Sequence, residues 1–457
     1  MFLSAASLEQ ARRLYIFSLR ICMFRPACLV FTLILALVMP SGAQAAPDST
    51  ANDGGQLRFV VYVTRHGVRS PTGKSAQYNI YSAAPWPEWP VQPGYLTSHG
   101  YELMRLFGAY DRAQLSAAGL LSSAGCSDAA HVSFVADSDQ RTRQTAKALS
   151  EGLLPNCAAT VQAKPEDTPD ALFHPTEAGS VLIDSAGAVA AIRGRIGGDP
   201  QNLAAAYHAQ LAELDAVLAG CGLISAGAHD RQSIFAVPAT LMPGKGDHAA
   251  ELRGPLNTAS TLSENLLLEY TEGMPDAQVG WGCVHSDNLR SLLDLHTAAF
   301  DFTQRTPVIA RMQASNLLDH IRRALAQAAT GKAVGGSPSR VDDRVLFLVG
   351  HDTNIGNLAG LLDLTWIADG RRDDTPPGSA LVFELWESAQ HTMQVRVFFT
   401  SQSLAQMRSA ALLSPLNPPI RVPLYVPACS NIDLSCTWPD FERTVANSID
   451  TRAVVKE

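Results

Sequence analysis

The chain has 457 residues, of which 46% are hydrophobic and 17% are charged, a composition typical of globular proteins. This length is sufficient for one large domain or two domains. The net charge of −8 offers no basic surface for nucleic acid, so a nucleic-acid-binding protein is not predicted.

The first 46 residues are predicted to be a secretory signal peptide rather than part of the fold. An apolar stretch over residues 27–39 follows Arg25 and is too short to cross a bilayer comfortably. Ala43-Gln44-Ala45 comes next and is typical of a signal cleavage site, with cleavage after Ala45 or Ala46. An uncleaved membrane anchor is the alternative. We therefore expect a periplasmic or secreted protein with no membrane segment after cleavage.

Three apolar runs, over residues 57–63, 131–136 and 345–349, are predicted to be strands, and each ends in polar residues. Near-continuous apolar runs are typical of parallel strands covered on both faces. The second run is followed by Asp137-Ser138-Asp139, which favours the N-cap of a helix. Ligands bind beyond the carboxyl ends of strands in open α/β sheets, so these strand ends predict a site. The side chains delivered there are Arg65, His66, Arg69, Arg141 or Arg143, His351 and Asp352.

The arginines in this group predict an anionic ligand, and phosphate suits them best. Guanidinium groups bind phosphate through paired hydrogen bonds and are costly to bury together without an anion. The alternative is that each arginine pairs with a surface carboxylate. A histidine among arginines is expected to have a lowered pKa, which makes His66 the expected nucleophile toward phosphorus. His351 is then a further phosphate donor, and Asp352 is the expected acid for the leaving oxygen.

The cysteines predict disulfides. Eight cysteines minus Cys22 and Cys28 of the signal leave six, and an even number in an exported chain indicates pairing. Proximity in the sequence favours Cys126–Cys157 and Cys429–Cys436. Neither a CxxC nor an HExxH motif occurs, so no metal site is predicted, and the proposed chemistry requires no cofactor.

Three motifs resemble one enzyme family, the histidine acid phosphatases. Residues 65–71 (RHGVRSP) resemble its RHGxRxP signature, and residues 351–354 (HDTN) resemble its second motif as found in bacterial periplasmic phytases. Residues 139–146 (DQRTRQTA) resemble its third phosphate-binding segment, in which the first arginine, here Arg141, contacts phosphate. The likeness extends over most of the chain after the signal.

The resemblance implies an α/β fold with a mostly parallel central sheet flanked by helices and an inserted, mostly helical second domain. The α/β phosphatase domain would comprise residues 47–165 and 335–457, and the substrate-cleft domain residues 166–334. Apolar residues at helical spacing over 202–218 and 316–327 agree with a helix-rich middle.

The resemblance also implies an acid phosphomonoesterase that works through a phosphohistidine. Its expected residues are His66 as nucleophile, Asp352 as proton donor, Arg65, Arg69, Thr72, Arg141 and His351 at the phosphate, and Lys74 and Glu264 in the substrate pocket.

Some positions depart from the family pattern. Gly73 separates Lys74 from the Pro-Thr pair that precedes the lysine of the phytases, which puts a contact of Lys74 with distal phosphates in doubt. Glu264 is equally explained as a solvated helix residue. Cys221 has lost its family neighbour and Cys283 has no family counterpart, so these two either pair with each other or stay free.

Phytate is the favoured substrate, because Gly67 and Thr353 differ from the pattern of the glucose-1-phosphatase branch. A sugar phosphatase of that branch is the first alternative, and a non-catalytic phosphate-binding protein is the second. We expect a monomer whose partner is a small phosphate monoester.

Overall fold

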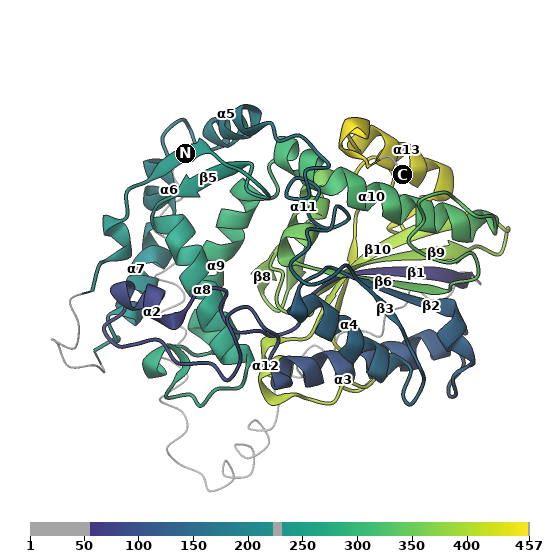
Figure 1. The fold of residues 1–457 in the computed structure, drawn as a ribbon, viewed down its shortest axis with the longest axis horizontal. Coiled ribbons are helices and arrows are strands. Elements are labelled where there is room, and N and C mark those ends of the chain that lie inside the picture. The colour runs from purple at the N-terminus through teal and green to yellow at the C-terminus, as the bar shows by residue number, and fades with distance from the viewer. Residues whose placement is uncertain (1–54, 223–230, 456–457) are drawn as a thin grey trace, which may run out of the picture. The chain divides into compact units, whose positions relative to one another are not determined.

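A mixed β-sheet with helices on both faces forms one side of the molecule (Figure 1). The computed structural model describes residues 55–222 and 231–455, so the signal peptide expected over residues 1–46 lies outside the described residues. The strand order is β11-β10-β9-β1-β6-β2-β3, and β12 pairs with β10. The strands are β1 (Gln56–Arg65), β2 (Val132–Ala136), β3 (Val161–Gln162), β6 (Val345–Gly350), β9 (Ala380–Glu387), β10 (Met393–Ser401), β11 (Ile420–Leu424) and β12 (Ser435–Thr437).

The two halves of the sheet differ in strand direction. Strand β6 lies parallel to both β1 and β2, and β2 lies parallel to β3. Strand β9 runs antiparallel to β1, and β10, β11 and β12 continue the antiparallel half. The expected α/β class with parallel central strands is confirmed, and the antiparallel half makes the sheet as a whole mixed.

Strand β1 shows why the apolar runs are continuous. Its residues Phe59, Val61 and Val63 pack toward one hydrophobic cluster, and Val60 and Tyr62 pack toward another on the opposite face. The first face is covered by α10 (Pro307–Thr330), α11 (Asp352–Leu362) and α13 (Trp438–Ser448), and the second by α3 (Ser98–Ala117) and α4 (Gln140–Leu153) (Figure 1). A strand between two helical layers needs apolar side chains at every position.

The remaining helices form the other side of the molecule, around a third hydrophobic cluster (Figure 1). The helix expected over 202–218 is two helices that meet at Tyr207, whose φ of −107° and ψ of 23° are not helical. The helix expected over 316–327 is confirmed as part of α10. The part of this helix from residue 314 to 325 packs on the sheet, whereas Ile309 and Met312 near its start belong to the third cluster. The elements of this side are α2 (Ser75–Tyr78), α5 (Ser185–Arg195), α6 (Gln201–Ala206), α7 (His208–Leu218), β4 (Thr240–Pro243), β5 (Ala250–Arg253), α8 (Pro255–Thr271), α9 (Ser286–Thr303) and α12 (Leu404–Ser409). The short strands β7 (Ile367–Ala368) and β8 (Arg371–Arg372) pair with each other, and Ala368 packs in the first cluster on the sheet.

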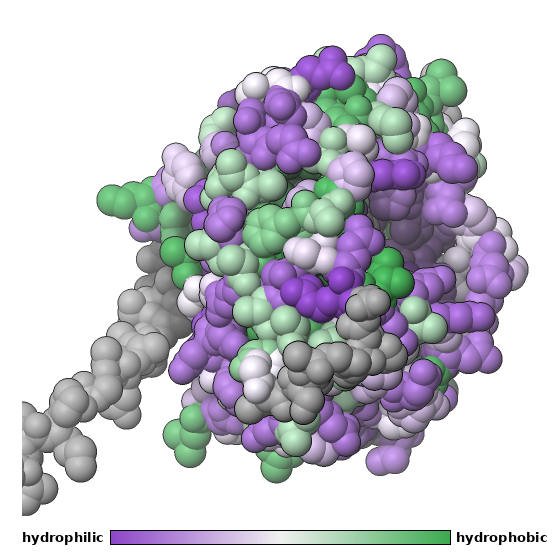
Figure 2. Space-filling view, turned by 90° about the vertical axis from the view of Figure 1, so that its left-hand side faces the viewer, coloured by the Kyte–Doolittle hydropathy of each residue, from purple (hydrophilic) through white to green (hydrophobic). Residues whose placement is uncertain are grey.

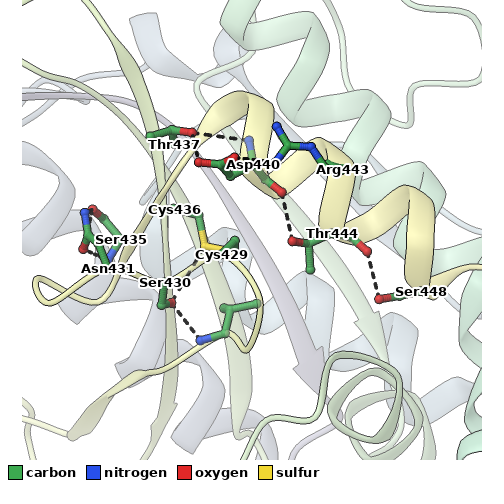
Figure 3. The surroundings of a disulfide bond; sticks show 11 residues. Cys429, Ser430, Asn431, Ser435, Cys436, Thr437, Asp440, Arg443, Thr444 and Ser448 are labelled. Atoms are coloured by element: carbon green, nitrogen blue, oxygen red, sulfur yellow. Dashed lines mark hydrogen bonds and ion pairs between the residues drawn. A yellow bond between two sulfur atoms is a disulfide. The ribbon is translucent and has the colours of Figure 1, made fainter.

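Three disulfides join the six cysteines of the described residues. They are Cys126–Cys157 and Cys429–Cys436, which proximity in the sequence favoured, and Cys221–Cys283, for which the sequence left pairing or free cysteines open. The last of these ties the loop before β12 to β12 itself, directly ahead of α13 (Figure 3). Thr437 then caps α13 by accepting a hydrogen bond from the backbone N–H of Asp440.

No helix within residues 55–222 and 231–455 combines the length and the apolar character needed to cross a bilayer.

Candidate active site

The carboxyl ends of three parallel strands bring the predicted residues together. At the end of β1, the backbone N–H of His66 donates to the carbonyl of Gly350 at the end of β6, at 2.9 Å. The N–H of Asp137, just after β2, donates to the carbonyl of Val349 at 3.0 Å. The last ladder hydrogen bonds therefore fix the strand ends relative to each other, and the side chains that follow them converge.

The ring of His66 is held in one orientation by its own loop. Its Nδ1 lies 2.9 Å from the carbonyl oxygen of Gly67, which only accepts, so Nδ1 carries the proton and Nε2 keeps a lone pair. The ring is 2% exposed. Burial lowers the pKa of His66 well below its usual value, and Arg141, Arg65 and Arg69 lower it further. The sequence predicted this direction from the arginines, whereas burial is the larger cause.

Gly67 itself has no room for a side chain. A Cβ at this position would lie 2.8 Å from Cγ of Met104 and 3.0 Å from the carbonyl oxygen of Gly100. This close approach to α3 explains a glycine directly after His66, in addition to the carbonyl that orients the ring.

The arginines contact carboxylates from both sides of the molecule. Arg65 is fully buried, and its Nη2 pairs with Glu264 of α8 and, at 2.8 Å, with Oδ2 of Asp352. Arg69 Nη2 donates to the same Glu264 oxygen at 3.0 Å. Arg141 pairs with Asp139. Within the described residues, the buried Nε–H groups of Arg65, Arg69 and Arg141 have no hydrogen-bond partner.

Glu264 is a buried partner of these arginines rather than a solvated helix residue. Burial alone would raise the pKa of its carboxyl, but Arg69 and Arg65 outweigh burial and lower the pKa to about 2. The carboxylate is therefore ionised at any ordinary pH and offsets the charge of two guanidiniums.

His351 lines the same pocket and is oriented by Asp137. Its Nε2 lies 2.8 Å from Asp137 Oδ2, and its Nδ1 lies 3.4 Å from Arg141 Nη2. The same Asp137 oxygen is 3.1 Å from Nε2 of His174, whose Nδ1 contacts Asp247. Burial is the main cause that lowers the pKa of His351, and Arg141 and His174 contribute.

A cavity of 320 Å³ connects these groups. Most predicted residues line it, whereas Lys74 is exposed and is not among its lining residues. Arg65 is not a lining residue either; it is fully buried and pairs with two residues that do line the cavity, Glu264 and Asp352. The predicted residues on the wall are His66, Arg69, Thr72, Arg141, Glu264, His351 and Asp352.

Sequence reasoning missed the second layer of the site. Asp137 and Asp139 were expected to cap α4, but Asp139, the N-cap residue, makes no capping hydrogen bond through its side chain and pairs with Arg141 instead. Asp137 faces His351 and His174. The only signal for Asp137 was its place at a strand end. His174 and Asp247 carried no sequence signal, because they lie in loops far from every motif.

Comparisons with known proteins place this geometry among phosphatases. The family model of the histidine phosphatase superfamily (branch 2) matches residues 56–216 and 258–400. The chain is 36% identical over 419 residues to phytase AppA of Escherichia coli strain K12, covering 90% of this chain and 96% of that protein. It is 28% identical over 440 residues to a glucose-1-phosphatase of Providencia rettgeri, covering 92% and 99%. A Hafnia alvei phytase solved in complex with myo-inositol hexakis sulphate has a TM-score of 0.79 at 36% identity, covering 90% of this chain and all of that one.

Proposed function

Since the chain belongs to the histidine phosphatase superfamily, branch 2, we propose that it is an acid phosphomonoesterase that forms a phosphohistidine on His66. One observation carries the proposal. The Gly67 carbonyl holds the proton of His66 on Nδ1, so the Nε2 lone pair remains for attack in a pocket lined by Arg69, Arg141 and His351.

The reaction follows from these positions in two steps. His66 Nε2 attacks phosphorus, the bond from phosphorus to the ester oxygen breaks, and Asp352 gives that oxygen a proton. Water then attacks the phosphohistidine, Asp352 takes a proton from the water, and His66 and inorganic phosphate are released. Asp352 is the first residue of α11, so its backbone position places the carboxyl at the strand end next to Arg65.

Phosphate binding is the proposed task of Arg65, Arg69, Arg141 and His351, with Thr72 adjoining. The three buried Nε–H groups without partners support this role, because a buried donor that is not satisfied costs free energy until an acceptor binds. Phosphate oxygens supply several acceptors at once. The guanidiniums thereby stabilise the charge that a metal ion stabilises in other phosphatases, and we propose that neither a metal nor a cofactor takes part.

The proposed substrate is phytate or a related phosphate monoester. Two of the relatives reported above are named phytases, and one of them binds an inositol hexakis sulphate. The catalytic cavity adjoins a second cavity of 390 Å³, with Glu264, Phe300 and Gln304 in the wall of both. This combined space suits a ring that carries several phosphates.

Because Glu264 comes from α8, we also propose that residues 166–334 serve as the cleft domain and residues 47–165 and 335–457 as the phosphatase domain.

A sugar phosphatase is the second candidate. Glucose-1-phosphatases are among the similar proteins, and Lys74, the residue expected to reach distal phosphates, does not line the cavity. A substrate with a single phosphate would not need that contact.

We propose that the mature protein is a monomer in the periplasm or outside the cell. Three disulfides are typical of an oxidising compartment. On the face that Figure 2 shows, hydrophobic residues are interspersed with hydrophilic ones, and this face therefore gives no support to a large apolar interface.

A phosphate-release panel tests the proposal. Phytate, glucose 1-phosphate and p-nitrophenyl phosphate are the substrates, and a chelator should leave all rates unchanged. Rapid quenching with labelled substrate should trap acid-labile, alkali-stable label on the wild-type protein, and His66→Ala should lose both label and turnover. Acid-stable label on a serine, or activity that requires an added divalent metal, would contradict the mechanism.

A further inference from the structure

His174 lies behind His351, between two carboxylates, and has no part in the mechanism described so far. Its Nε2 is 3.1 Å from Asp137 Oδ2, and its Nδ1 contacts Asp247 Oδ2. Asp137 Oδ2 also faces His351 Nε2 at 2.8 Å. The four side chains thus form a continuous row, Asp247–His174–Asp137–His351, that ends at the pocket.

The contacts of His174 require a cation. Both ring nitrogens face carboxylate oxygens, which only accept, so both nitrogens must carry protons. Burial alone would lower the pKa of His174, but the hydrogen bonds to Asp137 and Asp247 outweigh burial and raise the pKa to about 10.

Asp247 is itself firmly held. Its Oδ1 accepts from Thr176 Oγ1 at 3.0 Å, and its backbone carbonyl accepts from Gln313 Nε2 at 3.0 Å. The position of His174 is therefore determined from both the strand-end side and the β4–β5 loop.

The cation at His174 affects His351 in two ways. By sharing one oxygen of Asp137, it fixes the carboxylate to which His351 Nε2 donates, and thereby the direction of the ring. The two imidazole rings are also only 4.8 Å apart between centroids, so a positive charge on one opposes a positive charge on the other. In the structure, His351 Nδ1 lies 3.4 Å from Arg141 Nη2, which only donates, so Nδ1 keeps a lone pair there. Donation to phosphate through Nδ1, while Nε2 donates to Asp137, therefore requires a second proton on His351.

We propose that His174 is a positioning residue for the proposed phosphatase reaction, a buried cation fixed by Asp137 and Asp247 that orients His351 and confines its doubly protonated form to acidic solution. This inference rests on the proposed function, and it assigns to the His174 cation part of the preference for acid. Other charged or titratable groups face the row and stay in place in every variant below. They are His66, Arg69, Asp139, Arg141, Glu177, His248, Glu264 and Asp352.

The pH profile of kcat/KM on p-nitrophenyl phosphate tests the proposal, because it reports ionisations of the free enzyme. His174→Asn removes the cation. The pH at which kcat/KM falls on the alkaline side should therefore rise by about one pH unit, whereas the fall on the acid side should stay in place. Asp247→Asn leaves the His174 cation paired with Asp137 and removes one negative charge, so this variant should not move the alkaline limb to higher pH. The matched control is His131→Asn, just before β2 at the opposite end of that strand, which should not move the profile.

Imidazole signals of ¹⁵N-histidine-labelled protein provide a readout that does not need turnover. In the wild type, the His174 ring should keep both protons through neutral pH, and His174→Asn should raise the titration midpoint of His351. A His174 midpoint near that of a free histidine, or a uniform loss of activity with no change in either limb, would overturn the proposal. So would tight binding of one Zn²⁺ that His174→Asn abolishes, since the ligand atoms of Asp137, His174 and His351 lie within 4.8 Å of one another. Wild-type protein that lacks turnover would instead contradict the proposed function, and the histidine signals would still decide the state of His174.

Discussion

Two carboxylates, Asp352 and Glu264, share the guanidinium of Arg65. A phosphate that binds to Arg65 must therefore compete with both. For Asp352 this contact also supports a different interpretation, in which the carboxylate orients the arginine and takes no part in proton transfer. The two roles predict different effects of an Asp352 substitution on substrates with good and poor leaving groups.

Asp352→Asn separates these roles. A sugar or inositol alkoxide is a poor leaving group and needs a proton in the transition state, whereas p-nitrophenolate hardly needs one. General acid catalysis typically contributes about 10²–10⁴-fold, so the variant should lose most of its burst-phase rate on phytate or glucose 1-phosphate and much less on p-nitrophenyl phosphate. Burst-phase rates are the quantity to measure, because hydrolysis of the phosphohistidine is common to all substrates. Equal losses on both kinds of substrate would assign Asp352 the purely structural role.

Glu264→Gln should weaken the fold and strengthen phosphate binding. Removing one partner of a buried ion pair costs about 3 kcal/mol, and Arg65 is fully buried beside Glu264. The variant should therefore unfold at lower denaturant concentration and bind inorganic phosphate more tightly, as measured by titration calorimetry. Glu102→Gln on α3 is the control, since Glu102 pairs with Arg105 on the surface and should change neither property. Weaker phosphate binding by Glu264→Gln would show that the carboxylate assists the ligand.

At the scale of elements, helix α8 carries a second buried carboxyl besides Glu264, that of Glu269, which contacts the backbone of a neighbouring turn. Glu269 accepts a hydrogen bond from the backbone N–H of Gly280 at 2.9 Å. Gly280 and Trp281 have φ values of 51° and 58°, and Trp281 packs on Trp86 at 5.0 Å between ring centroids. The Glu269 carboxyl thus holds the left-handed turn at Gly280 and Trp281 against helix α8. Burial raises the pKa of Glu269 from 4.5 to about 8.

This raised pKa makes stability depend on pH. Below pH 4.5 the carboxyl is protonated in both the folded and the unfolded chain, and no stability is lost. As the pH rises toward 8, only the unfolded chain ionises, so the folded state loses up to about 1.4 kcal/mol per pH unit. Glu269→Gln keeps an acceptor for Gly280 and cannot ionise. The denaturant midpoint of Glu269→Gln should therefore rise relative to that of the wild type as the pH rises. The exposed control Glu88→Gln should have the same midpoint as the wild type at every pH. A constant difference between Glu269→Gln and the wild type would contradict this account.

Elements with local signals were predictable from the sequence, and contacts between distant loops were not. The strand at 57–63 can be predicted because burial on both faces requires apolar side chains along its length. The carboxyl ends of parallel strands lie at the same edge of the sheet, which predicts where the site is. Arg65, His66 and His351 follow from that rule, which left Arg141 and Arg143 open until the family resemblance favoured Arg141. His174 and Asp247 do not, because they lie in two loops that are far apart in the sequence. No local pattern of residues predicts a contact between such loops.

At the scale of the whole molecule, the disulfides differ in the length of chain that they close. Cys221–Cys283 spans 62 residues, Cys126–Cys157 spans 31 and Cys429–Cys436 spans only 7. In the chain-entropy model the first is worth about 4 kcal/mol and the last about 2 kcal/mol. Replacing both cysteines of Cys221–Cys283 by serine should thus lower the denaturant midpoint more than the same change at Cys429–Cys436. Non-reduced peptide mapping must first show these pairs, and Cys126 linked to Cys221 or Cys283 would contradict the assignment.

The division of the molecule was harder to infer than its chemistry. The insertion expected over residues 166–334 contains α10, yet α10 completes the helical layer over β1 and β6. In the other direction, Trp86, from the segment assigned to the α/β domain, packs in the cluster of the helical region. Sequence order predicts which segments are helical, but packing partners depend on apolar faces that lie far apart along the chain.

The central place of β1 has a consequence for the timing of folding. Both edges of this strand are filled by strands made near the end of synthesis, since Val60 pairs with Val345 on one side and with Glu384 on the other. A growing chain therefore carries the His66 motif for most of its synthesis without the neighbours that would bury it. Such long-range pairing delays sheet formation until the last strands emerge. The site around His66 therefore cannot form before β6 and β9 have both been synthesised.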